Sequence, residues 1–423
     1  MMAKFDHEFL LGAATAAHQV EGNNTQCDFW ALEQMKHTDY AEPSLNACDH
    51  YHRFAEDIRL LAEAGLNAYR FSVEWARVEP EEGVWDDEAL CHYDKMIDCC
   101  LSNGVEPIVT LHHFSSPRWL ICKGGWEAES TVEDFARYAA YVTERLGGKL
   151  RYICTINEAN MGIQMASIVQ RYLLKMRGAD SKVQVGVNLD RMMAGSLEAA
   201  AEKEAIFGTS APKTFLTPRS AEGDRIIQQA HRAAYKAIKQ IQPEIKVGLT
   251  LSLHDIQSQP GGEVKADEEW NQEFLHYLPC IENDDFLGVQ NYTRTQIGAS
   301  GQLPVPDDTE LTQMGYEYYP EALENVIRKV VKDYHGDILV TENGIATADD
   351  SRRTAFISRA TDGVVNCLRD GLPVKAYLYW SLLDNFEWQK GYSMTFGLIS
   401  VNRETQERTP KDSLRFLGAM RQN

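Results

Sequence analysis

The sequence predicts a closed barrel of eight parallel β-strands, a (β/α)₈ or TIM barrel, with its active site at the C-terminal strand ends. First, eight short apolar or β-rich segments recur along the chain, separated by amphipathic segments of helical period. Alternating strands and helices favour a parallel sheet. Second, polar side chains directly follow most of these segments. A barrel gathers its strand ends around one mouth, whereas a doubly wound open sheet, the alternative that periodicity alone leaves open, scatters them.

The predicted strands are short and spread over the whole chain. In order they are Phe9–Ala14, Ala68–Val73, Pro107–Leu111, Tyr152–Ile156, Val247–Leu253, Phe286–Val289, Ile338–Thr341 and Ala376–Trp380. Between them lie segments such as Phe54–Ala64 and Ala322–Val331, whose apolar residues recur at helical spacing.

The chain is predicted to form one domain over residues 1–423. No Gly/Ser-rich or Pro-rich linker divides it, and barrels of this class run past about 250 residues as single domains. The longest departure from the repeating pattern is residues 159–231, which we expect to form a helical insertion after the fourth strand. The segment Gly301–Asp308 is expected to be a surface loop.

The composition excludes several classes of partner. The chain has 42 basic and 62 acidic residues, a formal net charge of −20, which repels phosphate backbones and anionic lipid. We therefore expect no nucleic acid or membrane partner, and no apolar run approaches the ~20 residues of a membrane span. The nine cysteines lack the spacing of a disulfide scaffold or zinc ribbon, so we expect reduced thiols. Acidic rather than basic residues precede the apolar stretch Phe9–Ala17, which argues against a signal peptide and favours a cytoplasmic location.

Two glutamates are the main candidates for chemistry. Glu158 and Glu342 each follow a β-rich run closely and each neighbours an asparagine. Either one alone is explained equally well as a cap of the following helix. Together at one barrel mouth they supply the protonated and the ionised carboxyl that glycoside cleavage needs. Asn157, beside Glu158, is suited to binding a sugar hydroxyl, and near the C-terminus Trp380, Glu387 and Trp388 offer apolar faces for sugar rings beside a polar partner.

Histidine pairs raise the alternative of a metal-dependent hydrolase, which we do not favour. His50 and His52 precede a helical run, so Asp49 is expected to cap that helix and the histidines to pack or hydrogen-bond locally. No metal and no cofactor is expected.

The segments that contain Glu158, Glu342 and Trp380–Trp388, together with Phe9–Gly22 near the start, resemble glycoside hydrolase family 1, which includes the β-glucosidases. The likeness spans nearly the whole chain. Further matching segments are Asp49–Asp57, Tyr69–Ser72, Thr110–Phe114, Leu287–Thr293 and Val340–Gly344.

The resemblance implies a retaining double displacement, with Glu342 as nucleophile and Glu158 as acid/base about 5–5.5 Å away. It implies that Arg70 and Tyr292 support the nucleophile, the cation keeping Glu342 ionised. It also implies a cis peptide between Trp380 and Ser381. The expected substrate-binding residues are Gln19, His113, Asn157, Gln290, Trp380, Glu387, Trp388 and Phe396.

The expected substrate is a small-molecule β-glucoside or cello-oligosaccharide cleaved at its nonreducing-end β-D-glucosyl unit, with galactosyl and fucosyl units as alternatives. Members acting on 6-phosphorylated sugars replace the carboxylate of Glu387 with a small residue, so a 6-phospho-β-glucosidase using Lys390 and Tyr392 is the less favoured reading. A carbohydrate-binding barrel without turnover is a further alternative. Departures from the family pattern, such as Gln290 for asparagine and Phe114 for tryptophan, leave the preferred sugar and aglycone open.

Overall fold

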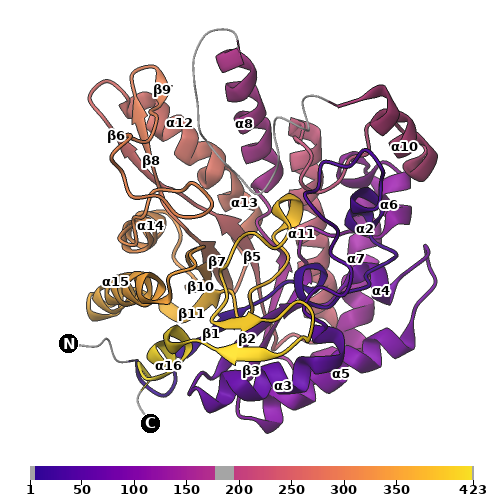
Figure 1. Ribbon diagram of the computed structural model, residues 1–423, viewed down its shortest axis with the longest axis horizontal. Helices are drawn as coiled ribbons and strands as arrows, with labels where there is room; N and C mark the ends of the chain where they lie inside the picture. The colour runs from indigo at the N-terminus through magenta and orange to yellow at the C-terminus, as the bar shows by residue number, and fades with distance from the viewer. Residues whose placement is uncertain (1–4, 177–194, 422–423) are drawn as a thin grey trace.

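The structure, a computed structural model, describes residues 5–176 and 195–421 and contains a closed parallel barrel (Figure 1). Around the barrel the strands follow the order β1-β11-β10-β7-β5-β4-β3-β2. Their bounds are β1 Leu10–Ala14, β2 Ala68–Ser72, β3 Glu106–His112, β4 Tyr152–Ile156, β5 Lys246–Ser252, β7 Phe286–Gln290, β10 Asp337–Asn343 and β11 Val374–Trp380. Because β1 pairs with both β2 and β11, the sheet has no free edge. The predicted barrel is confirmed, and all eight predicted strands take part.

The strands are buried on both faces, which explains their apolar sequences. One face points into the barrel, where Leu10, Ile108, Cys154, Phe286 and Leu378 share a single interior cluster. The other face packs beneath the helices in a second, larger cluster. The interior is therefore a packed core, and most of the polar side chains of the candidate site lie near the ends of the strands.

Helices surround the barrel. Their bounds are α1 Ala17–Val20, α2 Asp28–Glu33, α3 His50–Glu63, α4 Trp75–Val78, α5 Asp87–Ser102, α6 Arg118–Cys122, α7 Ser130–Leu146, α8 Met161–Met176, α10 Leu197–Phe207, α11 Ala221–Ile241, α12 Glu263–Glu273, α13 Leu278–Ile281, α14 Ala322–Val330, α15 Asp350–Arg369 and α16 Asp412–Gly418. The helix α11 packs along α7 and leads directly into β5, as an outer helix of the barrel does.

The expected insertion at residues 159–231 contains α8, α10 and the first half of α11. Its residues 177–194 lie outside the described part of the chain, so its extent and the single-domain organisation stay predictions.

Two small sheets extend the barrel. The strands β6 Asp255–Ser258, β8 Arg294–Gly298 and β9 Gly301–Gln302 form one, and β12 Ile399–Val401 pairs with β13 Arg408–Pro410 in the other. The first sheet packs against α12, and α8 lies on the other side of α12 (Figure 1). The Gln272 amide of α12 donates to Ser167 Oγ of α8 at 3.0 Å. The segment Gly301–Asp308 begins with the two residues of β9, and the rest of it is a largely exposed loop, as expected. This loop also forms a wall of the central cavity, which was not expected.

The predicted cap of α3 by the Asp49 side chain is wrong. Asp49 lies at the N-cap position with a left-handed φ of 51°, and its side chain makes no capping hydrogen bond. Its Oδ1 instead lies 2.7 Å from Nδ1 of His52. His50 bonds Asp57 at 2.7 Å and the Tyr69 hydroxyl at 3.1 Å, so these histidines bond locally as expected.

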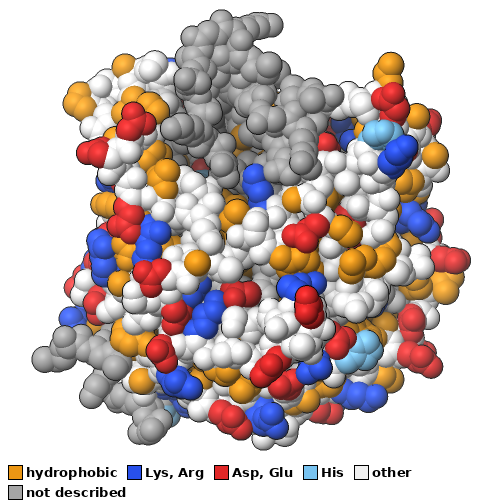
Figure 2. Space-filling model, viewed as in Figure 1, with side chains coloured by type: hydrophobic (Ala, Val, Ile, Leu, Met, Phe, Trp, Pro, Cys, Tyr) orange, Lys and Arg blue, Asp and Glu red, His pale blue; other side chains and the backbone are white. Residues whose placement is uncertain are grey.

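The surface has a mixed charge. On the coloured part of the face in Figure 2, Lys and Arg side chains lie interspersed with Asp and Glu rather than in one patch. Within the described residues, no helix combines the length and apolarity that crossing a bilayer requires.

Candidate active site

A cavity of about 760 Å³ opens at the carboxyl ends of the strands and contains both candidate glutamates. Of the twelve residues expected at the site from sequence, nine line this cavity. They are His113, Asn157, Glu158, Tyr292, Glu342, Trp380, Glu387, Trp388 and Phe396. The other three, Gln19, Arg70 and Gln290, lie directly behind them and contact them by hydrogen bonds.

Glu342, near the end of β10, is held at both carboxylate oxygens. Its Oε1 accepts from Arg70 Nη1 at 2.8 Å and from Gln290 Nε2 at 3.0 Å. Its Oε2 accepts from the Tyr292 hydroxyl at 2.5 Å. These donors fix the orientation of the carboxylate and favour its ionised form.

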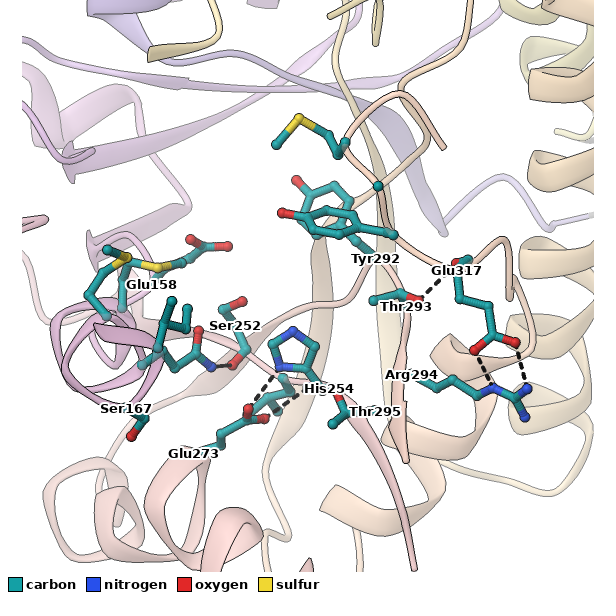
Figure 3. Close-up of a pocket in the computed structure, with 18 of the residues that line it drawn as sticks. Glu158, Ser167, Ser252, His254, Glu273, Tyr292, Thr293, Arg294, Thr295 and Glu317 are labelled. Atoms are coloured by element: carbon teal, nitrogen blue, oxygen red, sulfur yellow. Dashed lines mark hydrogen bonds and ion pairs between the residues drawn. The ribbon is translucent and has the colours of Figure 1, made fainter. Parts of the chain in front are cut away.

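Glu158 follows β4 and projects into the same cavity. Its backbone has a left-handed φ of 44°, and its N–H donates to Thr250 Oγ1 of β5 at 2.9 Å. Figure 3 shows Glu158 and Tyr292 on opposite sides of one space. Two other cavity residues, Phe114 and Trp388, also have a positive φ. Such backbone conformations are uncommon outside glycine and concentrate where a side chain must be aimed at a site.

The two carboxyls are electrostatically unequal. Burial, and then the negative charge of Glu342, raises the pKa of Glu158 well above its usual value. Burial also raises the pKa of Glu342, but Arg70, Tyr292 and Gln290 act in the opposite direction. Because only Glu342 has a cation and two further donors on its oxygens, a single proton shared by the pair stays on Glu158.

Asn157 links several groups around the nucleophile. Its Oδ1 accepts from Arg70 Nη2 at 2.5 Å and from Gln290 Nε2 at 2.7 Å, and its Nδ2 lies 3.1 Å from Nε2 of His113. Burial lowers the pKa of His113 well below its usual value, so its imidazole is neutral. Gln290 and Asn157 thus join β7 and β4 directly behind the two glutamates.

Glu387 and the indole rings of Trp380 and Trp388 form a further part of the cavity wall, with Gln19 behind them. Gln19 Nε2 donates to the Phe386 carbonyl at 2.7 Å and to Glu387 Oε2 at 3.2 Å. The ring of Trp380 stacks on His113 at 5.5 Å, and its peptide bond to Ser381 is cis, as the resemblance implied. Within the described part of the chain, Gln19 Oε1 and His113 Nδ1 are buried and have no hydrogen-bond partner. Buried polar atoms normally have partners, so these two atoms indicate where a polar ligand binds.

The residues that suggested a phosphate site face elsewhere. Tyr392 donates its hydroxyl to the Ser44 carbonyl at 2.5 Å and receives the Arg403 guanidinium over its ring. Neither Tyr392 nor Lys390 lines the cavity. Among the described residues, no group of three or more His, Cys, Asp or Glu side chains is arranged to hold a metal ion.

Sequence reasoning missed the outer part of the cavity. There α8 contributes Met161, Gln164, Met165 and Ile168, which recur at helical spacing on one face. The pair of His254 and Glu273, joined at 2.8 Å between Nδ1 and Oε1, and Tyr316 also line the cavity (Figure 3 labels the pair). In the sequence, the helical spacing of these four α8 residues was the signal that could have indicated this part of the cavity.

Comparisons with known proteins agree with this geometry. The profile of glycosyl hydrolase family 1 matches residues 1–423. β-Glucosidase A of Acetivibrio thermocellus is 30% identical over 439 residues, covering 97% of this chain and 96% of that protein. The crystal structure of a β-glycosidase designated BGL167 has a TM-score of 0.87 at 44% identity, covering 98% of this chain and 96% of the other. The β-glucosidase of Thermotoga maritima in complex with glucoimidazole has a TM-score of 0.80 at 26% identity, covering 98% of each chain.

Proposed function

Because the chain belongs to glycosyl hydrolase family 1, we propose that this β-glycosidase is a retaining β-glucosidase with Glu342 as nucleophile and Glu158 as acid/base. The observation that carries the proposal is the unequal environment of two carboxyls in one cavity. Glu342 binds a cation and two further donors, whereas burial and then the charge of Glu342 raise the pKa of Glu158. Retaining glycosidases need one carboxylate that attacks and one acid that donates.

The first half of the reaction forms a glycosyl-enzyme. An ionised Glu342 oxygen attacks the anomeric carbon while the bond from that carbon to the aglycone oxygen breaks. The Glu158 proton passes to the departing oxygen, so the aglycone leaves as a neutral alcohol. In the second half Glu158 takes a proton from water, whose oxygen attacks the anomeric carbon and releases Glu342 as a carboxylate.

The switch of Glu158 from acid to base follows from the same electrostatics. While Glu342 is ionised, its charge opposes ionisation of Glu158. Once Glu342 is an ester that charge is absent, so the pKa of Glu158 falls and it acts as a base. We assign Arg70, Tyr292 and Gln290 to support of the nucleophile, because all three donate to its oxygens.

The residues that bind the sugar are assigned from the part of the cavity around Glu387 and the two indole rings. Gln19, Glu387 and Trp388 offer an amide oxygen, a carboxyl and an indole to the hydroxyls of the nonreducing-end sugar, and Trp380 offers a face for its ring. Asn157 is assigned to the 2-hydroxyl and Phe396 to the rim. An unphosphorylated glucosyl unit fits this part of the cavity better than a 6-phosphate, because Glu387 offers a carboxyl rather than a cation and Lys390 does not line the cavity.

Initial rates on aryl β-glucoside, β-galactoside, β-fucoside and 6-phospho-β-glucoside, with and without a chelator, test the proposal. We expect the glucoside to be hydrolysed fastest, with no effect of chelator and with β-glucose as the first anomer seen by NMR. Initial release of α-glucose would contradict retention. Binding without turnover would favour a carbohydrate-binding protein.

A further inference from the structure

The outer part of the cavity differs in chemistry from the part around the two glutamates. We call it the outer chamber and define it by Met161, Met165 and Ile168 of α8, with Leu303, Val305 and Leu311 on the loops after β9. Val305 and Leu311 are both 41% exposed, so these loops lie at the rim. The outer chamber is continuous with the space that holds Glu158 and Glu342.

The outer chamber lies on the side from which the aglycone departs. An acid must reach the leaving oxygen, so the aglycone extends past Glu158. The chain that follows Glu158 turns directly into α8, whose first residue, Met161, donates its N–H to the Glu158 carbonyl at 2.8 Å. Gln164, on the same helix face, donates to the Ser252 carbonyl at 2.9 Å and holds α8 against the end of β5. The face that α8 turns toward the aglycone is therefore fixed by that bond.

Where the lining is described, Phe, Tyr and Trp rings are confined to the inner part of the cavity. Among the described lining residues the Phe, Tyr and Trp side chains are Phe114, Tyr292, Tyr316, Trp380, Trp388 and Phe396. Phe114 packs on Trp388 at 5.2 Å and Phe396 on Tyr292 at 6.2 Å, and Tyr316 packs against the interior cluster that contains Trp380 and Phe396. The outer chamber instead offers thioether and aliphatic groups, which adapt to irregular apolar shapes but give a second sugar ring no flat face.

The charges of the outer part of the cavity oppose anions. Its carboxylates in the described part of the chain are Glu269, Glu273, Asp307 and Glu317. Its arginine, Arg294, already donates to Glu317 through Nε at 2.9 Å and Nη2 at 2.5 Å, and through Nη1 to Gln257 at 3.1 Å. Among the described lining residues, an anionic group entering here meets like charge without an uncommitted guanidinium.

From this lining we propose that the natural aglycone is an uncharged apolar alcohol or phenol rather than a second sugar or an acidic group. This deepens the proposed β-glucosidase function and rests on it. The aglycone body is bound by Met161, Met165 and Ile168 on one side and by the apolar loops on the other. Burial of apolar surface supplies its affinity.

The test compares glucosides whose leaving alcohols are similar in acidity, so that differences report binding rather than chemistry. The set is methyl β-glucoside, hexyl β-glucoside and 5-carboxypentyl β-glucoside, with cellobiose as the sugar aglycone. We expect kcat/KM for the hexyl compound to exceed that for the methyl compound at least tenfold, which corresponds to about 1.4 kcal/mol. We also expect it to exceed that for cellobiose and for the carboxylate.

A matched pair of variants assigns the effect to α8. Ile168 lines the outer chamber, whereas the adjacent Val169, also half-buried on α8, does not line it. Ile168→Gln should lower the ratio of hexyl to methyl kcat/KM at least threefold, and Val169→Gln should leave that ratio unchanged. Thermal unfolding of both variants shows whether either is destabilised.

The outcomes separate the two proposals. No hydrolysis of methyl, hexyl or aryl β-glucoside would overturn the proposed function and this inference with it. Turnover in which cellobiose, the methyl compound or the carboxylate equals or exceeds the hexyl compound would leave the β-glucosidase proposal standing and overturn the inference alone. An equal loss of the ratio in both variants would show that α8 does not bind the aglycone through this face.

Discussion

The guanidinium of Arg70 and the carboxylate of Glu342 form an ion pair of 2.8 Å in which the side chains are 0% and 4% exposed. The remaining donors of Arg70 are also engaged, with Nη2 2.5 Å from Asn157 Oδ1 and Nε 2.9 Å from Thr110 Oγ1. A buried ion pair is tolerated where its remaining hydrogen-bonding groups are satisfied, and removing one partner leaves an uncompensated charge. The ion pair should therefore contribute both to the free energy of unfolding and to the ionisation of Glu342.

Arg70→Met tests both contributions. The variant leaves Glu342 buried without its cation, so we expect a loss of about 3–5 kcal/mol in the free energy of unfolding. Because Arg70 lowers the pKa of Glu342, its removal raises that pKa, and the acidic limb of kcat/KM should move to higher pH. Denaturant unfolding and pH-rate profiles measure both effects. Arg145→Met, at an exposed pair with Asp87, is the control and should change stability by less than about 1 kcal/mol. An unmoved acidic limb would contradict this coupling.

Glu342→Gln tests the origin of the raised pKa of Glu158. The substitution keeps the shape of the side chain and removes its negative charge, so ionisation of Glu158 becomes easier and its pKa should fall. Carbon NMR titration of protein labelled at glutamate δ-carbons follows the change, and the Glu158→Gln, Glu342→Gln double variant identifies the resonance. An unchanged pKa would show that burial alone raises it.

Glu342→Ala should lower kcat with aryl β-glucosides by at least about 10⁴-fold, because the residue that forms the covalent intermediate is missing. Azide can enter the vacated space and attack the anomeric carbon directly. The product should then be the α-glucosyl azide, identified by NMR, while circular dichroism checks that the fold is retained. Normal hydrolysis by this variant would refute the assignment of Glu342 as nucleophile.

The barrel and its two glutamates were predictable because both leave a local mark in the sequence. Strands buried on both faces read as continuous apolar runs, so β5 and β10 stand out. Glu158 and Glu342 follow such runs closely, and closure of the barrel brings these strand ends to one mouth. Other features leave no such mark, even where the partner is a near neighbour in the chain. The expected cap at Asp49 failed because its backbone is left-handed and its side chain bonds His52 instead.

The outer chamber shows a different limit. The spacing of Met161, Met165 and Ile168 is visible in the sequence and predicts a helix with an apolar face. It does not say whether that face covers the core or lines a cavity. The bond from Gln164 to the Ser252 carbonyl of β5 decides the orientation, and it joins residues 88 positions apart. The position of Gln290 behind the nucleophile likewise depends on its contact with Asn157, 133 positions away.

Glu158→Ala should affect substrates according to their leaving groups. A poor leaving group such as an alkyl alcohol departs only with a proton, so we expect kcat/KM for methyl β-glucoside to fall by about 10²–10⁴-fold. A dinitrophenolate departs without protonation, so kcat/KM for dinitrophenyl β-glucoside should fall far less. Steady-state rates over a series of leaving groups give the slope of log kcat/KM against the pKa of the leaving alcohol. Equal losses across the series would count against Glu158 as the acid.

Glu387→Gln tests a pH-dependent component of stability in the ligand-free protein. Burial, then the charge of Glu342, raises the pKa of Glu387 from 4.5 to about 8, although Gln19 opposes this. Between these two pH values the unfolded chain has lost the proton and the folded chain keeps it, so the free energy of unfolding falls as pH rises. Glu387→Gln should flatten this decline by up to about 1.4 kcal/mol per pH unit.

Asp28 and Glu74, whose pKa values burial raises to about 7, contribute a decline of the same sign in both proteins and do not obscure the difference. Denaturant unfolding at a series of pH values measures the two curves, with the exposed Glu404→Gln as control. Since the carboxyl is protonated at low pH, wild type and Glu387→Gln should differ least there and diverge as pH rises towards 8. Parallel curves over this range would mean that Glu387 is ionised in the folded protein throughout. The hydrogen bond from Gln19 would then not be enough to explain its ionisation.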